Sequence, residues 1–150
     1  MATTGEICSR DVVVVPRDET VQSAAKLMRH NHVGTVVVVD EKNGRRTPVG
    51  IVTDRDVVIE VTAVDLNPNV ITVGDIMGPE LVTVRDDEGA FEAMDIMRRK
   101  GVRRLPVVDR EGGLAGIISV DDLLGVLSEE MSAMRRIVER ERAHEQSRRK

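Results

Sequence analysis

Two short motifs place a hydroxyl residue and a carboxylate at a spacing that could bind a nucleotide. Asp56 follows Thr53 by three positions, and Asp122 follows Ser119 by three. Each hydroxyl residue ends an apolar run that starts with a glycine. A strand ending in Thr or Ser predicts the N-cap of a following helix, which puts the aspartate in the first helical turn. Such a turn offers free N–H groups and partial positive charge to a phosphate, and its hydroxyl and carboxylate can hold a phosphate oxygen and a sugar diol.

The same spacing also predicts an ordinary helix cap. In the capping box [ST]-x-x-[DE], the hydroxyl and the carboxylate satisfy backbone N–H groups of the first turn. For either motif alone we therefore favour a cap over a binding site. The choice between the two depends on whether the arrangement recurs in a repeated unit.

The chain contains such a repeat. Shifted by 69 residues, 5–40 aligns with 74–109 without a gap, and 13 of the 36 pairs are identical. The offset falls to 66 where 50–60 aligns with 116–126, and the change lies near Asn43-Gly44, a hairpin-turn signal. Because structural repeats tolerate length changes in turns, the two motifs occupy the same point of two related units.

Each unit has the pattern β-α-β-β-α, which predicts an α+β fold. The expected strands are Val12–Val15, Thr35–Val39 and Val49–Val52 in the first unit, and Leu81–Val84, Leu105–Val108 and Ala115–Ile118 in the second. Apolar residues at helical spacing, such as Val21, Ala24 and Met28, predict the helix between the first two strands. We expect units over 5–63 and 73–130. Since each is too small to bury much surface alone, we expect them to pack about a pseudo-twofold axis.

Composition indicates a folded protein with an aliphatic core. The 150 residues are 41% hydrophobic and 32% charged, with one Phe and no Trp or Tyr. The core must therefore consist of Val, Ile, Leu, Met and Ala. The scarcity of aromatic rings disfavours binding of single-stranded nucleic acid, in which bases stack on such rings.

Charge and cysteine content narrow the setting further. The net charge is −4, and seven basic against three acidic residues in 131–150 leave −8 on 1–130, which makes nucleic acid an unlikely partner of the body. The single Cys8 allows no intrachain disulfide. The first residues do not resemble a signal peptide, and no apolar run is long enough to span a membrane, so we expect a cytoplasmic protein.

Residues 131–150 lie outside the repeat and form a charged helical tail. Leu127, Met131, Met134, Ile137 and Val138 keep helical spacing, so the preceding helix is expected to extend or restart here. The sequence leaves three uses open for this tail. It could be a solvated helix, a helix packed on a second subunit, or a contact for RNA or an acidic partner.

The repeated units resemble a tandem pair of cystathionine-β-synthase (CBS) domains, often called a Bateman module. The resemblance covers about residues 5–130 and rests on Gly74–Met77, on Val102–Asp109 and on the two glycine-to-aspartate motifs. The second unit matches the family pattern closely. The first departs from it, with Gly34-Thr35 at the position of Arg103-Arg104 and Val37 at that of Pro106.

This resemblance implies a ligand-sensing regulatory module, with no cofactor required. The implied ligand is AMP, ADP, ATP or S-adenosylmethionine, bound in the cleft between the repeats. It implies that Asp56 with Thr53, and Asp122 with Ser119, hold ribose and phosphate. It implies an adenine pocket along the first strand of each repeat, comprising Val13, Val14, Val15, Val82, Thr83 and Val84. Such modules commonly form homodimers, which we expect here, and they regulate other proteins; the sequence does not identify that partner.

Two arginines distinguish the two implied sites. In the family, basic residues on the middle strand of one repeat often face the ligand held by the other, which assigns Arg103 and Arg104 to the Asp56 site. The Asp122 site would then face Gly34 and Thr35, without charge. We therefore expect a charged nucleotide at Asp56, and at Asp122 a site that is weaker, empty or suited to a ligand of little charge. A solvated strand edge is the alternative role for the arginines.

Catalysis and metal binding are not expected. The carboxylates are accompanied by no P-loop, zinc signature or nucleophile beside a base. His30 and His32 are two positions apart near a helix end and do not share a face. Cys8 aligns with Met77 of the other repeat, which indicates packing. The alternatives to a nucleotide sensor are a structural or protein-interaction module with vestigial sites and an RNA-associated module that uses the tail.

Overall fold

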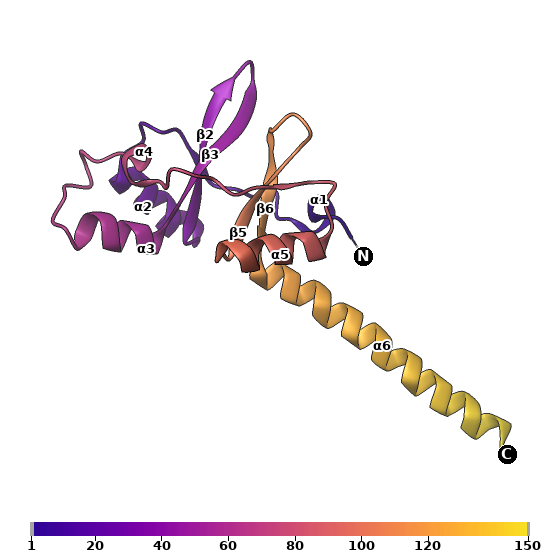
Figure 1. Cartoon of the computed structure of the whole chain (residues 1–150). Helices are drawn as coiled ribbons and strands as arrows, with labels where there is room; N and C mark the ends of the chain where they lie inside the picture. The colour runs from indigo at the N-terminus through magenta and orange to yellow at the C-terminus, as the bar shows by residue number, and fades with distance from the viewer. Residues whose placement is uncertain (1, 150) are drawn as a thin grey trace.

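The computed structural model describes residues 2–149 and contains two similar α+β units. The first comprises α1 (Thr4–Ile7), β1 (Val14–Val15), α2 (Val21–Asn31), β2 (Thr35–Lys42), β3 (Arg45–Thr53), α3 (Asp54–Val57) and the π-helix η1 (Val58–Thr62). The second comprises α4 (Val73–Ile76), β4 (Val84–Arg85), α5 (Ala90–Lys100), β5 (Arg104–Val108), β6 (Leu114–Ser119) and α6 (Val120–Arg148). Figure 1 shows the units side by side, with α6 projecting away from both.

The two sheets have the same topology. Their strand orders are β1-β2-β3 and β4-β5-β6, with a parallel first pair and an antiparallel second pair in each. Even the irregularity is repeated, because the register shifts between Val38 and Val39 in one sheet and between Val107 and Val108 in the other. The predicted α+β architecture and its internal repeat are confirmed.

The lengths of the elements differ from the predictions. The first strand of each unit lies at a sheet edge and pairs with its neighbour over only two residues. β2 and β3 are longer than predicted and form a hairpin. Its turn is the predicted one: Asn43 and Gly44 have φ of 55° and 74°, as the two-residue hairpin turn with two positive φ angles requires.

The second helix of each unit also differs between the two halves. In the first unit, α3 gives way to η1 after one turn, and Val61 is the residue of η1 that is buried. In the second unit, the helix and the tail are one element, α6, of 29 residues. The predicted extension of this helix is therefore confirmed up to Arg148, while Lys150 lies outside the described residues.

Each unit has its own aliphatic core. One core is built around Val15, Val36, Val38 and Val52, and the other around Val84, Leu105, Val107 and Ile118. The single phenylalanine, Phe91, is 59% exposed on α5. The prediction of a core without aromatic rings holds for the described residues.

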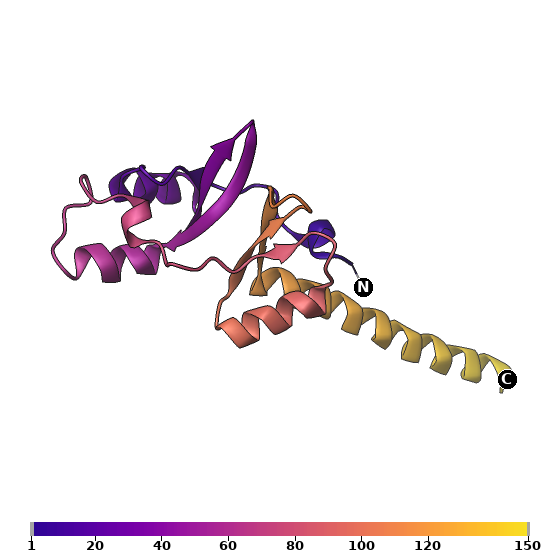
Figure 2. The same cartoon turned by 45° about the horizontal axis from the view of Figure 1, so that its top comes forward.

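The short leading helices are exchanged between the units. α1 packs on the second unit, where the Thr4 N–H donates to the Glu88 carbonyl at 2.7 Å. α4 packs on the first unit, where the Val73 N–H donates to the Glu19 carbonyl at 2.9 Å. Thr4 and Val73 are fully buried. Figures 1 and 2 show α1 beside β6, which belongs to the other end of the sequence.

Capping boxes set where these exchanged helices begin. Thr3 caps α1 with Glu6, and Thr72 caps α4 with Asp75. Asp75 Oδ2 accepts the Thr72 backbone N–H at 3.0 Å. This hydrogen bond holds the pKa of Asp75 below its usual value because it stabilises the carboxylate form.

The packing of α1 and α4 on the opposite units requires glycine at the first position of each glycine-to-aspartate motif. A Cβ at Gly50 would overlap the Met77 sulfur, and a Cβ at Gly116 would lie 2.6 Å from Cys8 Sγ. Met77 and Cys8 follow α4 and α1, so each seals the core of the unit it visits. Burial raises the pKa of the Cys8 thiol, in keeping with the packing role that its alignment indicates.

We expect alanine to destabilise the fold more at Gly116 than at Gly50. At Gly116 the new Cβ would also lie 2.6 Å from the Ser9 carbonyl, which is backbone and cannot rotate away. At Gly50 it meets chiefly the flexible Met77 side chain. Urea denaturation should show Gly116→Ala lowering the free energy of unfolding by about 2 to 3 kcal/mol, and Gly50→Ala lowering it by about 1 kcal/mol.

Gly125→Ala on α6 is the matched control. No atom lies within 4 Å of its Cβ position, so the substitution should leave the fold intact and raise helix stability by up to about 1 kcal/mol. Equal losses at Gly50 and Gly116 would contradict the backbone contact as the cause.

Candidate functional site

Both chemical motifs form capping boxes at helix starts. The Thr53 hydroxyl accepts the Asp56 N–H at 3.1 Å, and Asp56 Oδ2 accepts the Thr53 N–H at 2.8 Å. In the second motif the Ser119 hydroxyl accepts the Asp122 N–H at 3.2 Å, and Asp122 Oδ2 accepts the Ser119 N–H at 2.8 Å. The predicted caps are thus present in both units.

Each cap leaves part of the carboxylate free. Only Oδ2 of Asp56 and Oδ2 of Asp122 accept hydrogen bonds from the described residues. Both aspartates are half-buried. One oxygen of each carboxylate therefore remains available, so a cap does not preclude a contact to ribose hydroxyls.

A cavity of about 360 Å³ lies beside the first motif and is shared by the two units. The first unit contributes Ile51, Thr53, Asp54 and Arg55, and the second contributes Gly101, Val102, Arg103 and Arg104. Thr53 is thus brought together with both arginines, as the sequence predicts. Asp56 is hydrogen-bonded to Thr53 but does not itself line the cavity.

The charges around this cavity are predominantly positive. Three arginines face one carboxylate, that of Asp54. Asp54 Oδ1 accepts the Arg55 N–H at 2.8 Å, which holds the carboxylate against the start of α3. Arginine donors in a partly enclosed site favour an anion that can accept several hydrogen bonds, such as a phosphate.

The Asp54 side chain lies close to Gly34, the position at which the first unit departs from the family pattern. A Cβ at Gly34 would lie 3.0 Å from Asp54 Oδ2. In the second unit the position corresponding to Asp54 is Val120, and that corresponding to Gly34 is Arg103. The two differences thus lie next to each other in the first unit, where the Asp54 carboxylate borders Gly34.

A second cavity, of about 230 Å³, lies at the pseudo-symmetric position. It is lined by Asp11, Val12, Val13, His32, Val33, Gly34 and Thr35 from the first unit, and by Arg104 and Ile117 from the second. Arg104 thus lines both cavities, because it lies where the two units meet. The cavity that Gly34 and Thr35 line therefore also contains the charged groups of Arg104 and Asp11, whereas Arg103 lines the first cavity alone.

Thr35 carries an unsatisfied polar group at the second cavity. The residue is 8% exposed, and its hydroxyl makes no hydrogen bond to the described residues. Buried hydroxyl groups nearly always have a partner. Neither Ser119 nor Asp122 lines this cavity.

Of the residues of the implied adenine pocket, Val15 and Val84 lie in the two cores and Val13 lies at a cavity. Val15 and Val84 are 2% and 1% exposed, and their side chains pack in the two cores. Val13 lines the second cavity, but its carbonyl already accepts the Val37 N–H at 2.9 Å. Because β1 and β4 are edge strands, the remaining backbone groups on their outer edges are not used by the sheet.

Sequence reasoning missed several residues that line the cavities. They are Ile51, Asp54, Arg55, Gly101 and Val102 at the first, and Asp11, Val12, His32, Val33 and Ile117 at the second. The repeat contained a signal for some of them: Gly101 and Val102 align with His32 and Val33, and Ile51 aligns with Ile117.

Two further features of residues 2–149 bear on function. They contain no cluster of three or more His, Cys, Asp or Glu side chains arranged to hold a metal ion. None of the helices they form combines the length and the apolar character needed to cross a membrane.

Comparison with known proteins identifies the family. Residues 5–63 and 73–129 both match the model described as the CBS domain. The uncharacterized protein MK0525 of Methanopyrus kandleri is 42% identical over 122 residues, which are 81% of this chain and 61% of that protein. This chain thus spans about three fifths of that relative.

Solved structures agree in fold. A signal-transduction protein with CBS domains from Burkholderia ambifaria has a TM-score of 0.74 at 30% identity, over 84% of this chain and 93% of that one. CBSX2 in complex with AMP has a TM-score of 0.73 at 27% identity, over 87% and 99%. PAE2072 from Pyrobaculum aerophilum, complexed with AMP, has a TM-score of 0.71 at 29% identity, over 80% and 88%. With its repeated motifs, paired sheets and shared cavities, this chain belongs to the CBS-domain family as a tandem CBS pair.

Proposed function

We propose that this CBS pair is a regulatory sensor that binds an adenine nucleotide in the cavity beside Thr53. The observation that carries the proposal is the shared wall of that cavity, where Thr53 from one unit meets Arg103 and Arg104 from the other. The AMP complexes of CBSX2 and PAE2072 support the choice of ligand class. S-adenosylmethionine remains a candidate within the same adenosyl class.

The arginines are the groups that would bind phosphate. Arg103 and Arg104 can each donate two parallel hydrogen bonds to phosphate oxygens, and Thr53 lines the same cavity from the other unit. The Asp54 carboxylate opposes excess negative charge at the same place. This balance favours the single phosphate of AMP over the longer chain of ATP.

The remaining parts of the ligand have matching groups nearby. The free Oδ1 of Asp56 would accept from the ribose hydroxyls. Ile51 and Val102 supply aliphatic walls for the adenine ring. The resemblance assigns the ring to the backbone of Val82–Val84, which leads into the edge strand β4, although these residues do not line the cavity themselves.

The second cavity would bind a nucleotide more weakly. It contains Arg104 but not Arg103, and it adds the Asp11 carboxylate, which repels phosphate. The unpartnered Thr35 hydroxyl could donate to a ligand of little charge, such as adenosine. The two sites remain unequal in this proposal, although both contain an arginine.

Regulation would follow from the shared walls. A ligand that contacts both units stabilises the relative placement of the units in which all of its contacts are made. The size of this shift depends on how much more tightly the ligand binds that placement than the others. The output would pass to a partner protein, because neither cavity contains a nucleophile beside a base.

Substitution of the motif aspartates tests the unequal sites. Asp56→Asn keeps an acceptor for the Thr53 N–H, so the cap is preserved while the charge that binds ribose hydroxyls is lost. We expect this variant to weaken AMP binding about tenfold or more by calorimetry, and Asp122→Asn to have less than a threefold effect. Equal losses in the two variants would contradict the inequality.

Removal of the arginine that is confined to the first cavity tests phosphate recognition. Arg103→Ala should weaken AMP binding about tenfold and leave adenosine binding nearly unchanged, since only AMP carries phosphate. Arg110→Ala removes an equal charge from an exposed turn outside both cavities and is the matched control. Loss of AMP and adenosine binding to the same degree would assign Arg103 a structural role.

The alternative function is a structural or protein-interaction module with vestigial nucleotide sites. The Asp54 carboxylate inside the first cavity favours it, because that charge opposes phosphate. A thermal-shift panel with AMP, ADP, ATP, adenosine and S-adenosylmethionine separates the two. A ligand that binds only the native state must raise the melting temperature, so no shift with any of the five would support the alternative.

A further inference from the structure

The outer part of α6 presents an apolar stripe that the rest of the chain does not cover. Met131, Met134 and Val138 are 70%, 65% and 47% exposed, and Leu124 is 57% exposed closer to the body. Figures 1 and 2 show the helix extending away from both units. A helix of this length ordinarily depends on packing of its apolar face, so the stripe requires a partner.

The spacing of the stripe specifies the kind of partner. Leu124, Leu127, Met131, Met134 and Val138 follow one another at intervals of three, four, three and four residues. This alternation places apolar residues at positions a and d of successive heptads, the pattern of a two-stranded coiled coil. The stripe rises about 21 Å along the helix, at about 1.5 Å per residue.

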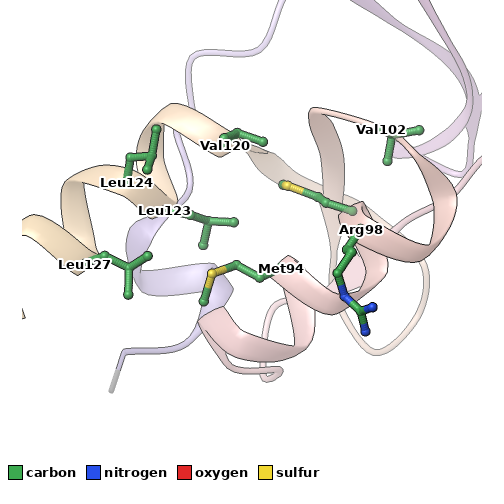
Figure 3. Close-up of a pocket in the computed structure, with 8 residues that line it drawn as sticks. Met94, Arg98, Val102, Val120, Leu123, Leu124 and Leu127 are labelled. Atoms are coloured by element: carbon green, nitrogen blue, oxygen red, sulfur yellow. The ribbon is translucent and has the colours of Figure 1, made fainter.

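The stripe continues into an apolar groove at the base of α6. The groove has a volume of about 280 Å³ and lies between α5 and α6, lined by Met94, Met97, Arg98, Val102, Val120, Leu123, Leu124 and Leu127. Figure 3 shows Leu123 and Met94 pointing into the space between the two helices. Arg98 is its only charged lining residue, so the groove and the stripe form one apolar surface.

We propose that this surface is covered by α6 of a second copy of the chain, in a parallel coiled coil about a twofold axis. In that arrangement Glu130, at position g, faces Arg135 of the second copy at position e. Because of the twofold axis, Glu130 of each copy pairs with Arg135 of the other, so the ion pair forms twice. Charges at e and g set the orientation of coiled coils, which argues for the parallel pairing.

Arg135 is free to change partners on assembly. In the single chain it pairs with Glu139 at 3.0 Å, through side chains that are 81% and 57% exposed. An exposed pair of this kind adds little stability, so its exchange for Glu130 of the second copy costs little. The mixed charges beside the stripe also suit self-pairing better than an anionic membrane, for which a basic face is typical.

The sequence also determines where the paired apolar stripe ends. Glu141 and Glu145 occupy the next d and a positions, where like charges from two copies would meet. The paired segment therefore extends from Leu124 to Val138, and the last turns of the two helices separate. Because this segment is only two heptads long, closure of the groove at its base is needed to stabilise the pair.

Cysteine cross-linking tests the register on the full-length chain. In a Cys8→Ser background, Met131→Cys places one thiol at the same a position of both helices. Mild oxidation should convert most of this variant into covalent dimer. Ser132→Cys, one residue further and on the outer face, should cross-link at least tenfold more slowly and is the matched control.

The alternative occupants give different results. In an antiparallel pair an a position lies opposite a d position, so a mixture of Met131→Cys with Met134→Cys, or with Leu127→Cys, would cross-link better than any of the three alone. That result, or equal cross-linking at 131 and 132, would overturn the parallel seam. If light scattering shows only monomer at concentrations up to about 100 µM, the proposal that two copies pair through α6 is overturned.

Charge reversal tests the ion pair without altering the apolar seam. Glu130→Arg places two like charges side by side and should weaken dimerisation about tenfold, whereas Glu130→Arg with Arg135→Glu should restore it. Sedimentation over a dilution series measures the effect. Equal weakening in the single and the double variant would overturn the pair. AMP titration of the same variants is independent, so failure of the seam and failure of the nucleotide site are distinguishable.

Discussion

The structure depends on the reciprocal exchange of two short helices. Each unit is a three-stranded sheet with too little chain to enclose its own core, and each core is completed by residues that precede the other unit. The backbone bonds from Thr4 to Glu88 and from Val73 to Glu19 fix this arrangement from both sides. Gly50 and Gly116 make it possible, because a side chain at either position would occupy the space of the visiting sulfur. The two units therefore form one cooperative structure.

This constraint gives the cavities their shared character. Because the exchange fixes both units in a pseudo-symmetric pair, the starts of β2, β5 and α3 converge with β6 at one boundary. A ligand there cannot contact Thr53 and Arg103 without bridging the units. If the protein acts as the proposed sensor, its response follows from packing, since the groups that would bind the ligand belong to both units.

The sequence predicts most of the fold because its repeat is in register. The α+β class, the hairpin at Asn43-Gly44 and the capping boxes all follow from local pattern, and all are present. The exchange does not follow, because an alignment shows that two segments are alike and not which unit each one packs on. The resemblance assigns Arg104 to one site, whereas in the structure it lies where the two units meet and borders both cavities.

The two glycine-to-aspartate motifs have nearly the same geometry, so they cannot by themselves give the two sites different ligand preferences. Thr53 with Asp56 and Ser119 with Asp122 make the same cap with nearly the same geometry. Any difference in ligand must arise from positions at which the repeats diverge, and two of these lie at the cavities. Asp54 approaches Gly34 closely in the first unit, whereas the second unit has Val120 and Arg103 at these positions. The two differences place Asp54 and Arg103, from opposite units, in the first cavity, whereas the second cavity contains Asp11 and Arg104.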